Sequence, residues 1–134
     1  MARKKSLNPT TEQLKALRLS AGLSQPAAAA LVHSTKRTWQ DWESGPTVMH
    51  AALYELFCLR ISRGLFTVAP LKSPKPHQIA QARKAARLSQ PAAAALIHST
   101  KRTWQDWEGD KSAMHPGLWE MFLFRLVEPF PPVL

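Results

Sequence analysis

The sequence SQPAAAALVHSTKRTWQDWE at residues 24–43 occurs a second time in this chain, as SQPAAAALIHSTKRTWQDWE at residues 89–108. The two copies need no gap to align, and they differ only where Val32 becomes Ile97. A repeat within one chain indicates that the same structural unit has been built more than once. We therefore expect the 134 residues to form two similar units joined by a linker.

Two short helices separated by a turn are predicted within the repeat. Ser24 is a favoured N-cap residue, and Pro26 falls in the first turn of the helix, where a missing N–H is tolerated. The four alanines at 27–30 favour helix and leave room for another helix to pack closely. Thr35 or Ser34 is the expected N-cap of the next helix, which should run to about Trp42.

This next helix should have a buried side and an exposed polar side. Trp39 and Trp42 are three residues apart, so both can enter the core. The opposite side, which we call the reading face, carries Lys36, Arg37, Gln40 and Asp41 in the first copy and Lys101, Arg102, Gln105 and Asp106 in the second. An ordinary solvated helix surface is the alternative, but the reading face is identical in both copies, whereas the first helix of each unit, which precedes the repeat at about 10–21 in the first unit, differs between them. The repetition favours a functional surface.

Flanking helices complete each unit. One should run from Thr10 or Thr11 to about Ala21, and another, after Gly45-Pro46, over roughly 49–61. The chain is thus expected to be all-α, with two tandem helix-turn-helix units. Its predicted parts are a basic arm at 1–9, a first unit at 10–63, a linker at 64–75, a second unit at 76–127 and a proline-rich tail at 128–134.

The composition favours a polyanionic partner. Lys and Arg number 18 against nine Asp and Glu, which gives a net charge of +9. Such a charge is typical of proteins that bind nucleic acid or an anionic membrane surface, although a basic protein without such a partner is the alternative. No apolar run reaches the ~18 residues of a membrane span, so we expect no membrane contact and an intracellular location. The single Cys58 is expected in the core, and the His and Cys residues lack zinc-site spacing, so no metal is expected.

The order of these elements resembles the lambda-repressor/Cro-type helix-turn-helix family, often called XRE. The resemblance rests on Arg18, Leu23-Ser24-Gln25, Ala28-Ala29, Thr35-Lys36-Arg37-Thr38 and Trp42-Glu43, all repeated from Arg83 to Glu108. Three positions depart from the family pattern. His33 and His98 stand where Gly is usual, Ser34 and Ser99 where an apolar residue is usual, and Trp39 and Trp104 where Ile or Val is common. A looser similarity is to small phage and plasmid autoregulators, including those encoded beside anti-CRISPR genes.

The resemblance implies that the helix after Thr35 enters the major groove of DNA. The base-reading candidates are then Lys36, Arg37, Gln40, Lys101, Arg102 and Gln105. Arg and Lys can donate to guanine O6 and N7, and Gln can pair with adenine N6 and N7. The phosphate-binding candidates are Ser24, Gln25, Thr35, Thr38, Ser89, Gln90, Thr100 and Thr103, together with Arg3, Lys4 and Lys5 of the arm. Asp41 and Asp106 could accept from cytosine or orient a neighbouring Arg, and we favour the second.

The expected function is sequence-specific binding of double-stranded DNA by a prokaryotic, phage or plasmid transcriptional repressor without a cofactor. Two near-identical units imply two similar half-sites, read by a monomer acting as a pseudo-dimer or by a homodimer. The alternative is an adaptor that binds RNA or protein through the same fold. An enzyme is not expected, because the few acidic residues are scattered and no nucleophile has an activating partner. Helix capping or phosphate contact is expected of His33, His50, His98 and His115.

Overall fold

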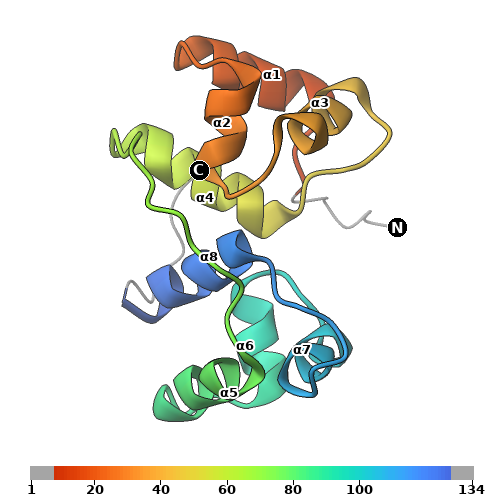
Figure 1. The fold of residues 1–134 in the computed structure, drawn as a ribbon, viewed down its shortest axis with the longest axis vertical. Coiled ribbons are helices and arrows are strands. Elements are labelled where there is room, and N and C mark those ends of the chain that lie inside the picture. The colour runs from red at the N-terminus through yellow and green to blue at the C-terminus, as the bar shows by residue number, and fades with distance from the viewer. Residues whose placement is uncertain (1–7, 128–134) are drawn as a thin grey trace, which may run out of the picture. The chain divides into compact units, whose positions relative to one another are not determined.

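The computed structural model describes residues 8–127, in which eight α-helices and no strands occur. The chain divides into two compact units, with the boundary between Ala69 and Pro70, inside the predicted linker (Figure 1). Unit 1 contains α1 (Thr11–Ser20), α2 (Gln25–Leu31), α3 (Lys36–Ser44) and α4 (Ala51–Ser62), and unit 2 contains α5 (Pro76–Ala85), α6 (Gln90–Leu96), α7 (Lys101–Glu108) and α8 (Pro116–Val127). The prediction of an all-α chain is confirmed over this range. The tail at 128–134 and most of the arm lie outside it.

Helix α1 begins and ends at the predicted signals. The Thr10 hydroxyl accepts a hydrogen bond from the Gln13 backbone N–H at 3.1 Å, and the Gln13 side chain accepts one from the Thr10 N–H at 2.9 Å. This reciprocal capping box satisfies two N–H groups that would otherwise lack partners. Gly22 follows the C-terminus of the helix with φ +71°, a left-handed conformation that costs glycine little.

The turn between α2 and α3 passes through a histidine in the left-handed region. Ser24 caps α2 by accepting from the Ala27 N–H at 3.3 Å, and the helix ends at Leu31. His33 then has φ +56°, and His98 has φ +54° at the equivalent place in unit 2. A residue with positive φ explains why glycine is usual here in the family that the sequence resembles. Histidine is among the side chains that adopt this conformation more often than most, so the turn keeps its path.

Helix α3 begins after Thr35, whose hydroxyl accepts from the Thr38 N–H at 3.2 Å. The helix extends to Ser44, beyond the expected end near Trp42, and stops at Gly45, which has φ +105°. In unit 2 the equivalent cap is the bond from the Thr103 N–H to the Thr100 hydroxyl at 3.1 Å, and α7 ends at Glu108.

The core of each unit is built around a fully buried tryptophan, and a second buried tryptophan follows three residues later. Trp39 is fully buried, as is Trp104 in unit 2, and this confirms the predicted buried side of the helix. The indole of Trp39 lies edge-on to Phe57 of α4, with 4.8 Å between ring centroids. Ala28 and Ala29 on α2 are also buried, and their small side chains leave the volume that the indole fills.

Helix α4 begins at Ala51, after a histidine cap. The Nδ1 atom of His50 accepts a hydrogen bond from the Ala52 N–H at 3.0 Å. In unit 2 the Nδ1 atom of His115 accepts one from the Gly117 N–H at 2.9 Å. The capping role expected of these two histidines is therefore confirmed.

Cys58 is only half-buried on α4, whereas the sequence predicted a position in the core. The burial it has raises the pKa of its thiol. Over residues 8–127 there is no group of three or more His, Cys, Asp or Glu side chains placed to hold a metal ion. None of the helices in that range is long and apolar enough to cross a membrane.

Candidate nucleic-acid interface

The reading face of α3 presents its cations to solvent. Lys36 is exposed, and the Arg37 side chain is 84% exposed. The Asp41 carboxylate lies 3.5 Å from the Arg37 Nε one helical turn later, an arrangement in which Asp41 orients the guanidinium. On α7 the same contact joins Arg102 and Asp106 at 3.4 Å. Exposed pairs of this spacing contribute only about 0.3–0.5 kcal/mol, so the guanidinium stays available to another partner.

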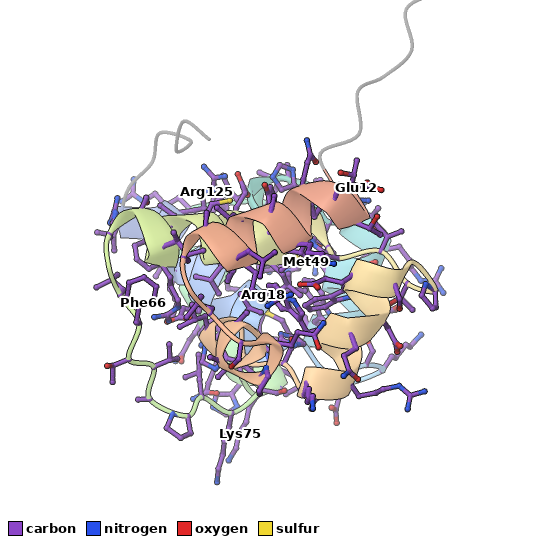
Figure 2. The ribbon with its side chains drawn as sticks, turned by 90° about the horizontal axis from the view of Figure 1, so that it is seen from above. Glu12, Arg18, Met49, Phe66, Lys75 and Arg125 are labelled. Carbon is purple, nitrogen blue, oxygen red and sulfur yellow. The ribbon has the colours of Figure 1, made fainter. Side chains whose placement is uncertain are left out.

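Beneath the reading face, Glu43 at the end of α3 ties three helices together. Arg18 of α1 donates from Nε to Glu43 Oε2 at 2.6 Å and from Nη2 to Oε1 at 3.1 Å. The indole N–H of Trp39 donates to the same Oε2 atom at 2.6 Å. Figure 2 shows Arg18 in the interior of the bundle, below α1. Because both side chains are largely buried, this bidentate ion pair fixes the position of α3 against α1.

From Glu43 a chain of hydrogen bonds leads back to the reading face. Gln25, at the start of α2, donates from Nε2 to Glu43 Oε1 at 3.2 Å. Its own Oε1 accepts from the Nε2 of Gln40 at 3.4 Å. An ionised carboxylate only accepts, so Gln25 must turn its amide nitrogen toward Glu43 and its oxygen toward Gln40. Gln40 consequently keeps its Oε1 and one N–H, the pair of groups that adenine recognition requires.

Unit 2 repeats this network bond for bond. The carboxylate is Glu108, and the equivalent distances are 2.6 and 3.1 Å from Arg83, 2.5 Å from Trp104, 3.2 Å from Gln90, and 3.3 Å from Gln105 to Gln90. The sequence repeat therefore reproduces a three-dimensional arrangement and not only a helix pattern.

The network changes the acidity of its carboxylates. Burial alone would raise the pKa of Glu43, but the hydrogen bonds from its three donors outweigh it and hold the pKa below the ordinary value. The same balance lowers the pKa of Glu108. The bond to Glu108 raises the pKa of Arg83 against the opposing effect of burial. Both carboxylates thus remain ionised at neutral pH and act as fixed acceptors.

The predicted phosphate-binding residues occupy the starts of α2 and α3 and their equivalents in unit 2. The hydroxyls of Ser24 and Thr35 are exposed and already serve as N-caps, and the Thr35 hydroxyl also contacts that of Thr38 at 3.0 Å. Gln25 is held by Glu43, so a phosphate would meet an amide whose orientation is set beforehand. Ser89, Gln90, Thr100 and Thr103 have the same environments in unit 2. Arg3, Lys4 and Lys5 lie outside the described residues.

Arg18 and Glu43 both belong to the pattern of the family that the sequence resembles, but nothing in that pattern pairs them. Their separation in sequence hides the contact, because only packing of α1 on α3 brings them together. A signal was present, since Arg83 and Glu108 recur at the same separation. Arg18 and Arg83 are retained on first helices that otherwise diverge, which indicates that this arginine has a partner in the repeated part of each unit.

Comparisons with known proteins identify part of this architecture. Residues 11–59 match a family model described as a helix-turn-helix domain. The chain is also similar to the type II methyltransferase M.MspI of Moraxella sp, with 44% identity over 43 residues, which are 32% of this chain and 10% of the methyltransferase. The chain therefore spans only a small part of that enzyme's length, and the likeness is confined to the helix-turn-helix region. Residues 11–59 of this chain form a helix-turn-helix domain, a class of domain whose typical partner is DNA.

Proposed function

We propose that this protein is a sequence-specific double-stranded DNA-binding regulator, a transcriptional repressor without catalytic activity, which reads two similar half-sites. Lys36, Arg37 and Gln40 of α3 contact base edges in one major groove, and Lys101, Arg102 and Gln105 of α7 do so at the second half-site. The helix-turn-helix match to residues 11–59 supports the first of these contacts.

The observation that carries the proposal is the recurrence of an identical reading face on an identical support. Core packing explains why Trp39 and Trp104 are the same, but it places no demand on the exposed Arg37 and Arg102. The buried Glu43 network holds α3 at a fixed position on α1 and α2, and such preorganisation lowers the entropic cost of docking a rigid helix in a groove. Two equivalent reading sites require that both the buried network around the glutamate and the exposed side chains of the reading face are kept.

The net charge of +9 supports a backbone contribution to binding. The logarithm of the binding constant falls linearly with the logarithm of the salt concentration, and the slope, which we call the salt slope, is about 0.9 for each phosphate that the protein neutralises. Two linked units also raise each other's effective concentration, so that weak individual contacts give tight binding to a duplex with both half-sites. An RNA- or protein-binding adaptor would show no preference for a duplex sequence, and a protein-binding adaptor would also lack this dependence on salt.

The test is selection of bound duplexes from a random-sequence pool at two salt concentrations. The proposal expects enrichment of a motif with two similar halves. The combined variant Lys36→Ala/Arg37→Ala should lose the information in one half, whereas Lys15→Ala, a loss of charge on the exposed side of α1, should keep both. The proposal fails if no duplex is enriched. It also fails if a pool of random single-stranded RNA binds the protein as tightly as the enriched duplexes do, because the reading face would then not be specific for DNA.

A further inference from the structure

The two units differ at the turn that joins their first two helices. Where unit 1 has Gly22, unit 2 has Arg87, and both adopt the left-handed conformation, with φ of +71° and +60°. One turn earlier, the exposed Leu19 of unit 1 is replaced by Lys84. The turn before α6 thus carries two cations that the turn before α2 lacks.

An arginine in this conformation is unfavourable. For side chains other than glycine, the left-handed region brings Cβ close to the following carbonyl oxygen. Asp110, which replaces Gly45, also has a positive φ of +61°, but aspartate is one of the residues enriched there, and arginine is not. A strained residue that persists where glycine would serve is a reason to look for a function of its side chain.

The turn is held firmly beside the interface of unit 2. Arg83 donates from Nη1 to the Leu88 carbonyl at 3.0 Å, and the Leu88 N–H donates back to the Arg83 carbonyl at 3.1 Å. Three residues after Arg87 stands Gln90, whose amide joins Glu108 to Gln105 on the reading face of α7. Cα atoms three residues apart are at most ~11 Å from each other, so the Arg87 backbone lies at the margin of this interface.

The side chains of Arg87 and Lys84 are exposed, and within residues 8–127 neither forms a side-chain hydrogen bond or ion pair. Unit 1 has one compensating cation, Lys15 in place of Ala80, but it stands nearly two helical turns before Gly22. The local charge at the turn is therefore a property of unit 2 alone.

We propose that Arg87, with Lys84 beside it, binds a backbone phosphate of DNA next to the half-site read by unit 2, a contact that unit 1 lacks. The inference rests on the proposed function and adds to it. The two units read bases alike, because their reading faces are identical, but they differ in affinity for the backbone. Unit 2 gains a sequence-independent contact at this turn, and the complex is asymmetric.

Two reciprocal substitutions test the proposal in the full-length chain, with a duplex taken from the selection and a scrambled duplex. Arg87→Gly gives unit 2 the turn of unit 1, and Gly22→Arg does the reverse. A Cβ at Gly22 would meet no heavy atom within 4 Å, so the introduced side chain has space, but it must adopt the same unfavourable left-handed conformation as Arg87. Arg87→Gly should lower the salt slope by about 0.9, which makes its affinity loss about three-fold greater at 50 mM than at 200 mM salt. The loss should be similar on both duplexes, and Gly22→Arg should raise the slope.

Thermal melting of the free proteins separates this role from a structural one. Removing the strained arginine should leave the melting temperature of Arg87→Gly unchanged or higher. An unchanged salt slope, or a change no larger than that of Lys15→Ala, would overturn the inference while leaving the proposed function intact. A lower melting temperature with an unchanged slope would overturn it in favour of a structural role. Failure of the wild-type chain to prefer any duplex would instead reject the proposed function itself.

Discussion

The indole Nε1 of Trp39 donates a hydrogen bond of 2.6 Å to the Oε2 atom of Glu43, one helical turn further along α3. The same bond joins Trp104 to Glu108 at 2.5 Å. An aliphatic residue at this position would fill space only, whereas the tryptophan both fills the core beside α2 and satisfies a largely buried carboxylate. This double role accounts for the departure from the aliphatic residue common in the family that the sequence resembles.

Trp39→Ala should therefore lower the free energy of unfolding of unit 1 by about 3–5 kcal/mol, because it removes a fully buried aromatic side chain. Trp39→Phe keeps most of the packing but removes the donor, and it should cost about 1.5–3 kcal/mol, the value of a hydrogen bond to a charged group. Urea unfolding measures both, and Trp104→Ala provides the matched loss in unit 2. A Trp39→Ala protein with an unchanged midpoint would refute the core assignment.

Stability should fall in acid because of Glu43 and Glu108. Their pKa values in the folded protein lie below the ordinary value of 4.5, so the unfolded chain binds protons first as the pH falls. The stabilisation is fully present above about pH 4.5 and is lost as the pH falls toward the folded pKa values. Urea midpoints measured from pH 6 down to ~3 should show this decline.

Glu43→Gln isolates the contribution of unit 1 to that decline. It leaves the buried guanidinium of Arg18 without a carboxylate and should cost about 3–5 kcal/mol at neutral pH. The remaining stability of unit 1 should then depend less on pH between ~5 and ~3, and Glu108→Gln should do the same for unit 2. An acid decline as steep in the double variant as in the wild type would place the titrating groups elsewhere.

Gln25 and Gln40 should separate phosphate binding from base reading. Gln25→Ala removes a candidate phosphate contact and the acceptor that orients Gln40, so it should weaken binding to all duplexes and reduce discrimination. Gln40→Ala should leave scrambled-duplex affinity unchanged and cost about 1–3 kcal/mol on the selected site. Titrations of both duplexes with each variant measure this, with Gln90→Ala and Gln105→Ala as the equivalents in unit 2. A Gln40→Ala loss that is equal on both duplexes would contradict base reading.

The turn residue His33 should tolerate only substitutions that suit a positive φ. His33→Val introduces a β-branched side chain at φ +56° and should destabilise unit 1 by about 1–2 kcal/mol. His33→Asn, of a type enriched in this conformation, is the matched control and should be milder. Thermal melting of the two variants makes the comparison, and equal melting temperatures would show that the backbone conformation is not what constrains this position.

Local signals in the sequence were sufficient for the helices. Ser24, Thr35 and Thr10 cap where their side-chain chemistry predicts, because a cap depends on residues only three apart. The burial of Trp39 could be predicted from helical spacing. The end of α3 at Ser44 could not be predicted in this way, because the helix continues until Gly45 adopts a left-handed conformation.

Contacts between helices were beyond local reasoning. The bond between Arg18 and Glu43 depends on how α1 packs against α3, and the orientation of Gln25 depends in turn on that carboxylate. The spacing of residues within one helix predicts neither the bond between Arg18 and Glu43 nor the orientation of Gln25. The half-burial of Cys58 is of the same kind, because helical periodicity places the residue on α4 but does not say which neighbours cover it.

Base reading by α3 and α7 is tested most directly by parallel duplex selection with the wild type, Arg37→Ala and Arg102→Ala. We predict a wild-type motif of two similar halves. Each variant should lose base preference in one half only, by about 1–3 kcal/mol, and the two variants should not affect the same half. Equal loss over all sequences would make these arginines phosphate contacts, and a motif unchanged by either substitution would contradict base reading by α3 and α7.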